Sequence, residues 1–99
     1  MEIEQIETGE TITLKVSGKL TAGTAEDFGV TVTDALTKTA YLVLDFQGVT
    51  YVASAGLRVL VLTQKKLAAA GGTLILRNLK SGILEIFQIT GLDSIFTIE

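Results

Sequence analysis

The sequence contains no cysteine, histidine, tryptophan or proline. Without cysteine and histidine, the chain cannot form disulfides or build the usual structural zinc sites. A serine–histidine–aspartate triad is excluded, as is a general base whose ordinary pKa lies near neutrality. Catalysis would have to depend on carboxylates, lysine or tyrosine. We therefore expect a protein that is not an enzyme and that uses no metal or cofactor.

Basic residues and long hydrophobic runs are also scarce. Eight lysines and arginines stand against eleven acidic residues, which gives a net charge of −3 and predicts no direct nucleic-acid partner. There is no stretch of about 18 apolar residues, the length a membrane-spanning helix needs. The first residues, MEIEQIE, also lack the basic and apolar regions of a signal peptide. These features predict a cytoplasmic location and no membrane association.

The overall composition of the sequence indicates a folded domain. Of 99 residues, 47% are hydrophobic and 19% are charged, which excludes a disordered chain. This length is enough for one hydrophobic core. We therefore expect a single domain over residues 1–99.

Strands are predicted in five parts of the chain. Residues 11–17 alternate polar and apolar side chains, which indicates a half-buried strand that ends at Gly18. Residues 41–46 are almost continuously apolar, as in a central strand covered on both faces. A turn at 47–48 and a short extended piece at 49–52 follow. Further strands are predicted at 3–7, 73–77 and 95–98.

Three segments with helical spacing of apolar residues lie between these strands, at 24–36, 54–70 and 81–90. Thr24 and Asp27 resemble a capping box, and Ser54 and Ser81 are predicted N-caps of the next two helices. The resulting order is β-β-α-β-α-β-α-β. It predicts an α/β domain with a mixed sheet and helices packed mainly on one face.

Asp45 is the main catalytic candidate. It follows a buried strand, where open α/β sheets place functional groups. No second carboxylate lies near it in the sequence, and an acid that caps a turn is the alternative interpretation. The four glutamates of the first ten residues suit a solvated edge strand. Such an edge predicts a monomer, with weak dimerisation as the alternative.

Ser54 stands where a strand-like segment turns into a helix. Its small neighbours, Ala53, Ala55 and Gly56, leave the hydroxyl accessible to another protein. A phosphate there would add about −1.5 to −2 charge at a helix N-terminus, which favours anions. The alternative is an ordinary helix cap. Ser54 is not a catalytic nucleophile, because the sequence supplies no base to activate it.

The segment DFQGVTYVASAGLRVL, residues 45–60, resembles the signature of STAS domains, in particular the bacterial anti-sigma factor antagonists. That signature has an acid that ends a strand, a small-residue turn, a short extended piece and a serine followed by a Gly-Leu pair and an apolar helix. Three other segments resemble family landmarks in the same order: Val16–Leu20, Ala70–Leu74 and Ile89–Leu92. The resemblance covers essentially the whole chain.

The resemblance implies partner switching. The unmodified antagonist of such a system binds an anti-sigma factor that is also a serine kinase, and the sigma factor is released. The kinase then phosphorylates a serine that corresponds to Ser54, the complex dissociates, and a serine phosphatase restores the antagonist. The implied partner-binding residues are Lys19, Thr21, Ala22, Gly23, Thr24, Ala53, Ser54, Ala55, Gly56 and Arg58.

Two positions differ from the family pattern. Ala53 replaces the acid that precedes the acceptor serine, and Thr21 replaces an acid after the earlier strand. If those acids position the hydroxyl, Ser54 is phosphorylated poorly or by an adapted kinase. The alternative within the fold is a STAS domain that only binds, as a stressosome-type scaffold or an accessory subunit of a lipid or anion transporter. A small enzyme built on Asp45 is the alternative of another class.

Overall fold

In the computed structural model, which describes residues 1–99, five strands form one sheet in the order of the sequence. The first pair is antiparallel and the other three pairs are parallel, so the predicted mixed sheet is confirmed. The strands are β1 (Glu2–Thr8), β2 (Thr11–Leu20), β3 (Tyr41–Val52), β4 (Thr73–Arg77) and β5 (Thr97–Ile98). The helices are α1 (Ala22–Leu36), α2 (Ser54–Ala69) and α3 (Ser81–Thr90), the last followed by a 3₁₀ turn at Leu92–Ser94. The predicted order of elements is confirmed.

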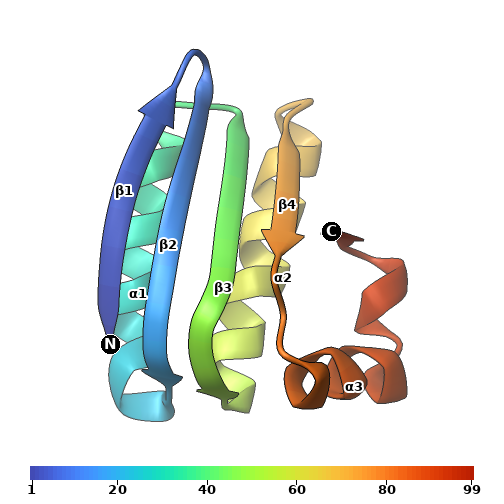
Figure 1. Cartoon of the computed structure of the whole chain (residues 1–99). Coiled ribbons are helices and arrows are strands. Elements are labelled where there is room, and N and C mark those ends of the chain that lie inside the picture. Colours follow the sequence, from blue (N-terminus) through green and yellow to red (C-terminus); the bar gives the residue numbers. More distant parts are fainter.

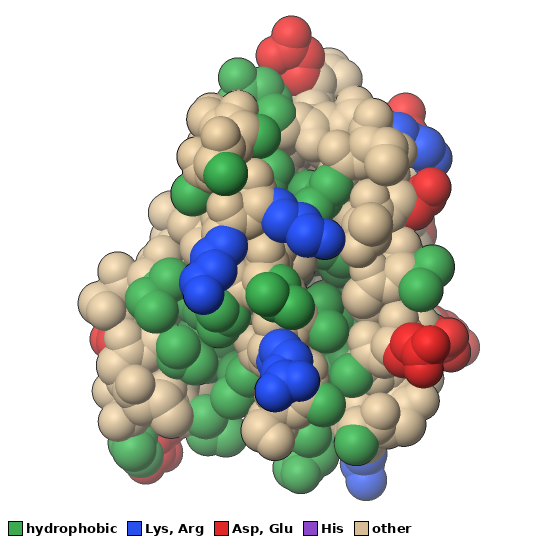
Figure 2. All heavy atoms as spheres, turned by 180° about the vertical axis from the view of Figure 1, so that it is seen from behind, with side chains coloured by type: hydrophobic (Ala, Val, Ile, Leu, Met, Phe, Trp, Pro, Cys, Tyr) green, Lys and Arg blue, Asp and Glu red, His purple; other side chains and the backbone are tan.

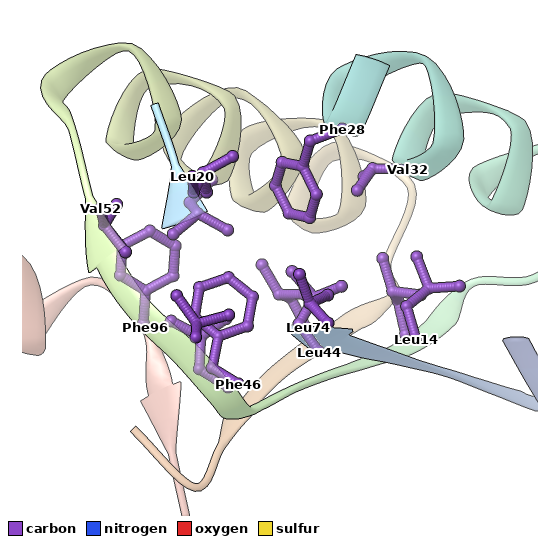
Figure 3. Packing of buried hydrophobic residues seen from close by; sticks show 14 of the residues in the cluster. Leu14, Leu20, Phe28, Val32, Leu44, Phe46, Val52, Leu74 and Phe96 are labelled. Atoms are coloured by element: carbon purple, nitrogen blue, oxygen red, sulfur yellow. The ribbon is translucent and has the colours of Figure 1, made fainter. Parts of the chain in front are cut away.

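Helices α1 and α2 lie side by side behind the sheet, and α3 lies beyond the end of β4 (Figure 1). The core fills the space between the sheet and these two helices. Phe28 and Val32 of α1 point toward leucines of the central strands (Figure 3). No helix covers the other face of the sheet. Leu42, Val43 and Leu44 of β3 are nevertheless all buried, so the predicted burial of this central strand on both faces is confirmed over these residues.

Strands β2 and β3 are longer than predicted, because the glycines expected to end them form irregularities within them. Gly18 adopts a φ of +99°, and the register between β2 and β3 shifts on either side of it. Gly48 lies so close to Ser17 that a Cβ at Gly48 would approach the Ser17 Cβ to 2.6 Å. Both strands therefore continue past their glycines and end opposite one another, with Leu20 in register with Val52.

Helices α2 and α3 begin at the predicted residues, Ser54 and Ser81, whereas α1 begins at Ala22, before the predicted residue 24. The residue that caps the helix differs from the prediction in all three. The N-cap of α1 is Thr21, three residues before the expected Thr24. Ser54 and Ser81 are the first helical residues of α2 and α3, and the caps are Ala53 and Lys80, which make no side-chain cap bond. Thr24 does belong to a capping box, but as the residue three positions into the helix that bonds back to Thr21.

Candidate functional site

The ends of β2 and β3 and the starts of α1 and α2 meet at one edge of the sheet (Figure 1). The backbone amide of Ala53 donates to the carbonyl oxygen of Leu20 at 2.8 Å, which joins the two strand-to-helix connections. Each strand is separated from its helix by a single residue. Since Leu20 and Val52 are in register, the two helices begin at the same level.

Gly56, in the first turn of α2, determines how closely that helix approaches β2. It is buried, and a Cβ there would lie 2.5 Å from Cγ and 2.7 Å from Cδ2 of Leu20. Only glycine leaves room for this approach. Within the predicted partner-binding set, Gly56 therefore acts through packing, and its neighbours supply the accessible surface.

The start of α1 is held by a network of threonine hydroxyls. Thr21 Oγ1 accepts from the amides of Gly23 and Thr24, at 3.2 and 3.3 Å. Thr24 Oγ1 accepts from the Thr21 amide at 2.8 Å and donates to the Lys19 carbonyl oxygen at 2.9 Å. These bonds satisfy donors that a helix start otherwise leaves free, and they fix the connection from β2 to α1.

The start of α2 has no comparable network. Its cap, Ala53, is extended, with φ −84° and ψ 166°, and it has no side chain that could accept a hydrogen bond. Ser54 is exposed, and its hydroxyl is not engaged in any hydrogen bond within the chain. The prediction that this hydroxyl caps the helix is therefore wrong. The hydroxyl is free to meet a partner.

The surroundings of Ser54 favour negative charge. Neither α1 nor α2 has an acidic residue in its first turn. Arg58 follows Ser54 by one helical turn, and these two residues line a shallow depression together with Ala55. The backbone amides of Ser54 and Ala55 have no acceptor within the chain. Free amides, the helix dipole and a nearby guanidinium are the features that attract an anion to a helix start.

Most of the predicted partner-binding residues lie together at this edge. Five are exposed, four are partly buried and one, Gly56, is buried; the exposed residues are Lys19, Ala22, Gly23, Ser54 and Arg58. Tyr51 lies outside the predicted partner-binding set, but it pairs in register with Lys19 and is 51% exposed. Its signal in the sequence is an aromatic residue three positions before Ser54, in a segment bounded by the buried Val49 and Val52. Exposed tyrosines are enriched at protein interfaces.

Asp45 is placed differently from the prediction. It lies in the middle of β3, because the strand continues to Val52. Its Oδ1 accepts from the Gln47 amide at 3.0 Å and from the Asn78 side-chain amide at 3.1 Å. Asn78 adopts a φ of +61°, so the carboxylate holds an irregular connection in place. These bonds support the structural interpretation of Asp45.

Two further types of site are not found in the structure. No group of three or more acidic, histidine or cysteine side chains is arranged to bind a metal ion. None of the three helices combines the length and the apolar character that crossing a membrane requires.

Comparison with known proteins identifies relatives of the whole fold. The STAS domain model matches residues 2–99. A protein of Bordetella bronchiseptica described as an anti-sigma factor antagonist, BtrV, is 44% identical over 57 residues, which are 58% of this chain and 49% of BtrV. The aligned part thus spans about half the length of that relative.

Two solved structures have the same fold. A Thermotoga maritima protein described as an anti-sigma factor antagonist superposes with a TM-score of 0.91 at 21% identity, over 97% of this chain and 84% of the other. The cell fate determinant SpoIIAA of Bacillus, in its phosphorylated form, gives a TM-score of 0.77 at 20% identity, over 99% and 91% of the two chains. At these identities the likeness concerns the fold.

Proposed function

The chain belongs to the STAS domain family, and from this we propose that it is an anti-sigma factor antagonist that switches partners through phosphorylation at Ser54. The observation that carries the proposal is the free, exposed hydroxyl of Ser54 at an uncapped helix start. The proposed partners are an anti-sigma factor that is also a serine kinase, and a serine phosphatase. The chemistry of the switch would belong to those partners.

The environment of Ser54 supports a modification that leaves the fold intact. The hydroxyl caps nothing, so its esterification would break no hydrogen bond of the chain. A phosphate would add about −1.5 to −2 charge close to the free amides of Ser54 and Ala55, where the helix dipole stabilises it. Arg58, one turn further along, can neutralise part of that charge. The modified protein would differ mainly in the charge of its partner-binding surface.

Phosphorylation can be tested with the cognate kinase and ATP, with the product followed by intact-mass and peptide mass spectrometry. We expect one phosphate per chain, on Ser54, and none on Ser54→Ala. Ser81→Ala is the matched control, because Ser81 is also an exposed first residue of a helix without a side-chain cap. This control should be modified like the wild type. Phosphate on another residue, or none with a kinase that binds, would contradict the proposal.

The effect of the added charge can be tested with Ser54→Asp. We expect weaker binding to the kinase, measured by isothermal titration calorimetry, because the surface that meets the kinase becomes negative. The melting temperature should stay near that of the wild type, since no cap is removed. Ser54→Asn is a neutral control of similar size and should retain most of the affinity. A variant that unfolds, or that binds unchanged, would count against the switch.

A STAS domain that only binds is the second candidate function. It is favoured by the two departures from the family pattern, which leave Thr21 and Ala53 where acids are expected beside the acceptor serine. A stable complex with a kinase that never modifies Ser54 would support this scaffold. A neighbouring gene for a lipid or anion transporter would support the accessory-subunit version, and neighbouring genes for a kinase and a sigma factor would support the antagonist.

A further inference from the structure

The two helices that cover the sheet carry opposite charges. Helix α1 contains three acidic residues and no basic one, and α2 contains three basic residues and no acidic one. They are Glu26, Asp27 and Asp34 on α1, and Arg58, Lys65 and Lys66 on α2. Figure 2 shows the basic side chains down the middle of this face, with hydrophobic side chains beside them and acidic ones at the right-hand edge. All six residues are exposed.

A groove of about 550 Å³ separates the two helices. Its lining includes Gly29 of α1 and Val59 of α2, and a Cβ at Gly29 would lie 3.6 Å from Cγ2 of Val59. Two large apolar side chains that line the groove are exposed: Val30 on α1, with an exposed fraction of 65%, and Leu62 on α2, with 50%. Apolar side chains exposed beside a groove and bordered by charge are typical of a surface that binds another protein.

Acids and bases of the two helices occur at matching heights. The helices begin level and run parallel, so each residue of α1 lies level with the residue of α2 thirty-two positions later. Glu26 is therefore level with Arg58, and Asp34 with Lys66. The exposed Val30 is level with Leu62. Helices of this length extend for about 23 Å, and the three levels span about 12 Å, which is about half of that length.

The matched charges are not paired across the groove within one chain. The two ion pairs of the structure are Lys38 with Asp34, one turn apart in sequence at 3.4 Å, and Arg77 with Glu99 at 3.0 Å. Glu26 and Lys66 both line the groove without making contact within ion-pair distance. Glu26, Arg58 and Lys66 thus make no ion pair within the chain, and Asp34 is paired only with the exposed Lys38. The opposite charges of α1 and α2 can therefore meet those of a partner that covers both helices.

We propose that this face binds a second copy of the chain, related by a two-fold axis parallel to the helices. Such an axis places α1 of one copy over α2 of the other in the same direction and at the same height. Glu26 and Asp34 then face Arg58 and Lys66 of the second copy, and Val30 faces Leu62. A two-fold axis across the helices would instead place acid over acid. The charge pattern therefore selects one symmetric arrangement.

This dimer goes beyond the proposed function, although Arg58 belongs both to it and to the surface around Ser54. It does not involve the acidic edge strand β1, on which the predicted monomer depends. The proposed contact involves only two helices of each copy, so the surface area that it buries is small for a specific interface. We therefore expect a dissociation constant in the micromolar range. The charges of this face are exposed. We therefore expect the dissociation constant to rise by about tenfold or more between low and high salt.

Sedimentation velocity across a concentration series, at low and high salt, tests the dimer. Asp34→Lys and Lys66→Asp should each give a monomer at concentrations where the wild type is dimeric. The double variant should dimerise again, because it exchanges the charges at positions 34 and 66, which face each other across the dimer and so remain opposite in sign. Lys15→Asp makes the same charge change on the open face of the sheet and should leave the dimer unchanged. Circular dichroism checks that each variant is folded.

The apolar part of the face has its own test. Val30→Asp places an unpaired charge in the centre of the proposed contact and should abolish the dimer at any salt concentration. A wild type that stays monomeric at low salt up to about 1 mM would overturn the inference, since interfaces of this class associate well below that concentration. A dimer that persists in Val30→Asp would also overturn it, as would a double variant, Asp34→Lys with Lys66→Asp, that fails to dimerise. If the variants weaken only the binding of another protein, the face serves that protein and the homodimer is overturned.

Discussion

Thr21 and Ala53 occupy the same position at the starts of neighbouring helices, and only Thr21 bonds to the backbone beyond it. The hydroxyl network of Thr21 and Thr24 satisfies the start of α1, whereas the first amides of α2 remain free. The difference between threonine and alanine at this position therefore decides whether the first backbone amides of the helix are hydrogen-bonded or free. The helix start with the free amides is the one that carries Ser54.

The missing cap of α2 leads to a stability prediction. Ala53→Asp should raise the free energy of unfolding by about 1 kcal/mol, because the backbone of Ala53 already has the extended geometry of a cap. Thr21→Ala should lower it by about the same amount, through the loss of the capping box. Urea denaturation measures both changes. An Ala53→Asp variant no more stable than the wild type would show that the side chain cannot reach the free amides.

At this scale, one of two predictions about Ser54 is confirmed and the other is wrong. Small neighbours predicted that Ser54 would be accessible, and it is exposed. Its assignment as a cap was wrong, because serine suits both the cap and the first helical position. Choosing between them depends on where β3 ends. That end is set by the pairing of Val52 with Leu20, a residue thirty-two positions earlier.

The packing of whole elements depends on a few close approaches of backbone, and Gly56 is the one nearest the candidate site. Its lack of a side chain lets α2 rest directly on Leu20 at the end of β2. Gly82, near the start of α3, is a glycine in a similar helical position with nothing within 4 Å of an added Cβ. The two glycines allow a matched comparison.

We expect Gly56→Ala to lower the free energy of unfolding by about 1–3 kcal/mol, since the new methyl group would overlap buried Leu20. Gly82→Ala should leave stability unchanged or raise it by up to about 1 kcal/mol, the general preference of helices for alanine. Chemical denaturation of both variants tests the difference. Equal stabilities would mean that α2 can shift away from β2 at little cost.

The strands show which features of an element can be read from the sequence. The order of strands and helices followed from hydrophobic periodicity, and it is confirmed. The ends of β2 and β3 did not follow, because a glycine can either end a strand or form a bulge within it. Gly18 and Gly48 form irregularities because the two strands pair on both sides of them. That pairing joins residues far apart in the sequence, so the local sequence pattern does not reveal it.

At the scale of the whole molecule, the C-terminal part depends on few buried side chains. Helix α3 buries only Ile83 and Phe87, and Phe87 packs on Phe96 with ring centroids 5.6 Å apart. The edge strand β5 has two residues. Strands β2 and β3 instead pair along most of their length in the centre of the core. Regions with little buried surface open more readily than the rest of a protein.

Native-state amide hydrogen exchange should therefore show a lower opening free energy for α3 and β5 than for β2 and β3. Phe96→Ala should speed exchange in α3 by removing its aromatic partner, with a smaller effect on the amides of Leu14 and Leu44 in the central strands. Equal protection throughout the chain would show that the molecule opens only as a single unit.

The level starts of α1 and α2 also have a kinetic consequence. The positive ends of two parallel helix dipoles lie together at one edge of a molecule whose net charge is −3. This asymmetry orients the molecule in the field of an approaching partner whose contact surface is acidic, and so raises the rate of productive encounter. A phosphate at Ser54 would cancel the positive end. In the proposed switch, modification would thus slow recapture of the antagonist as well as loosen the complex.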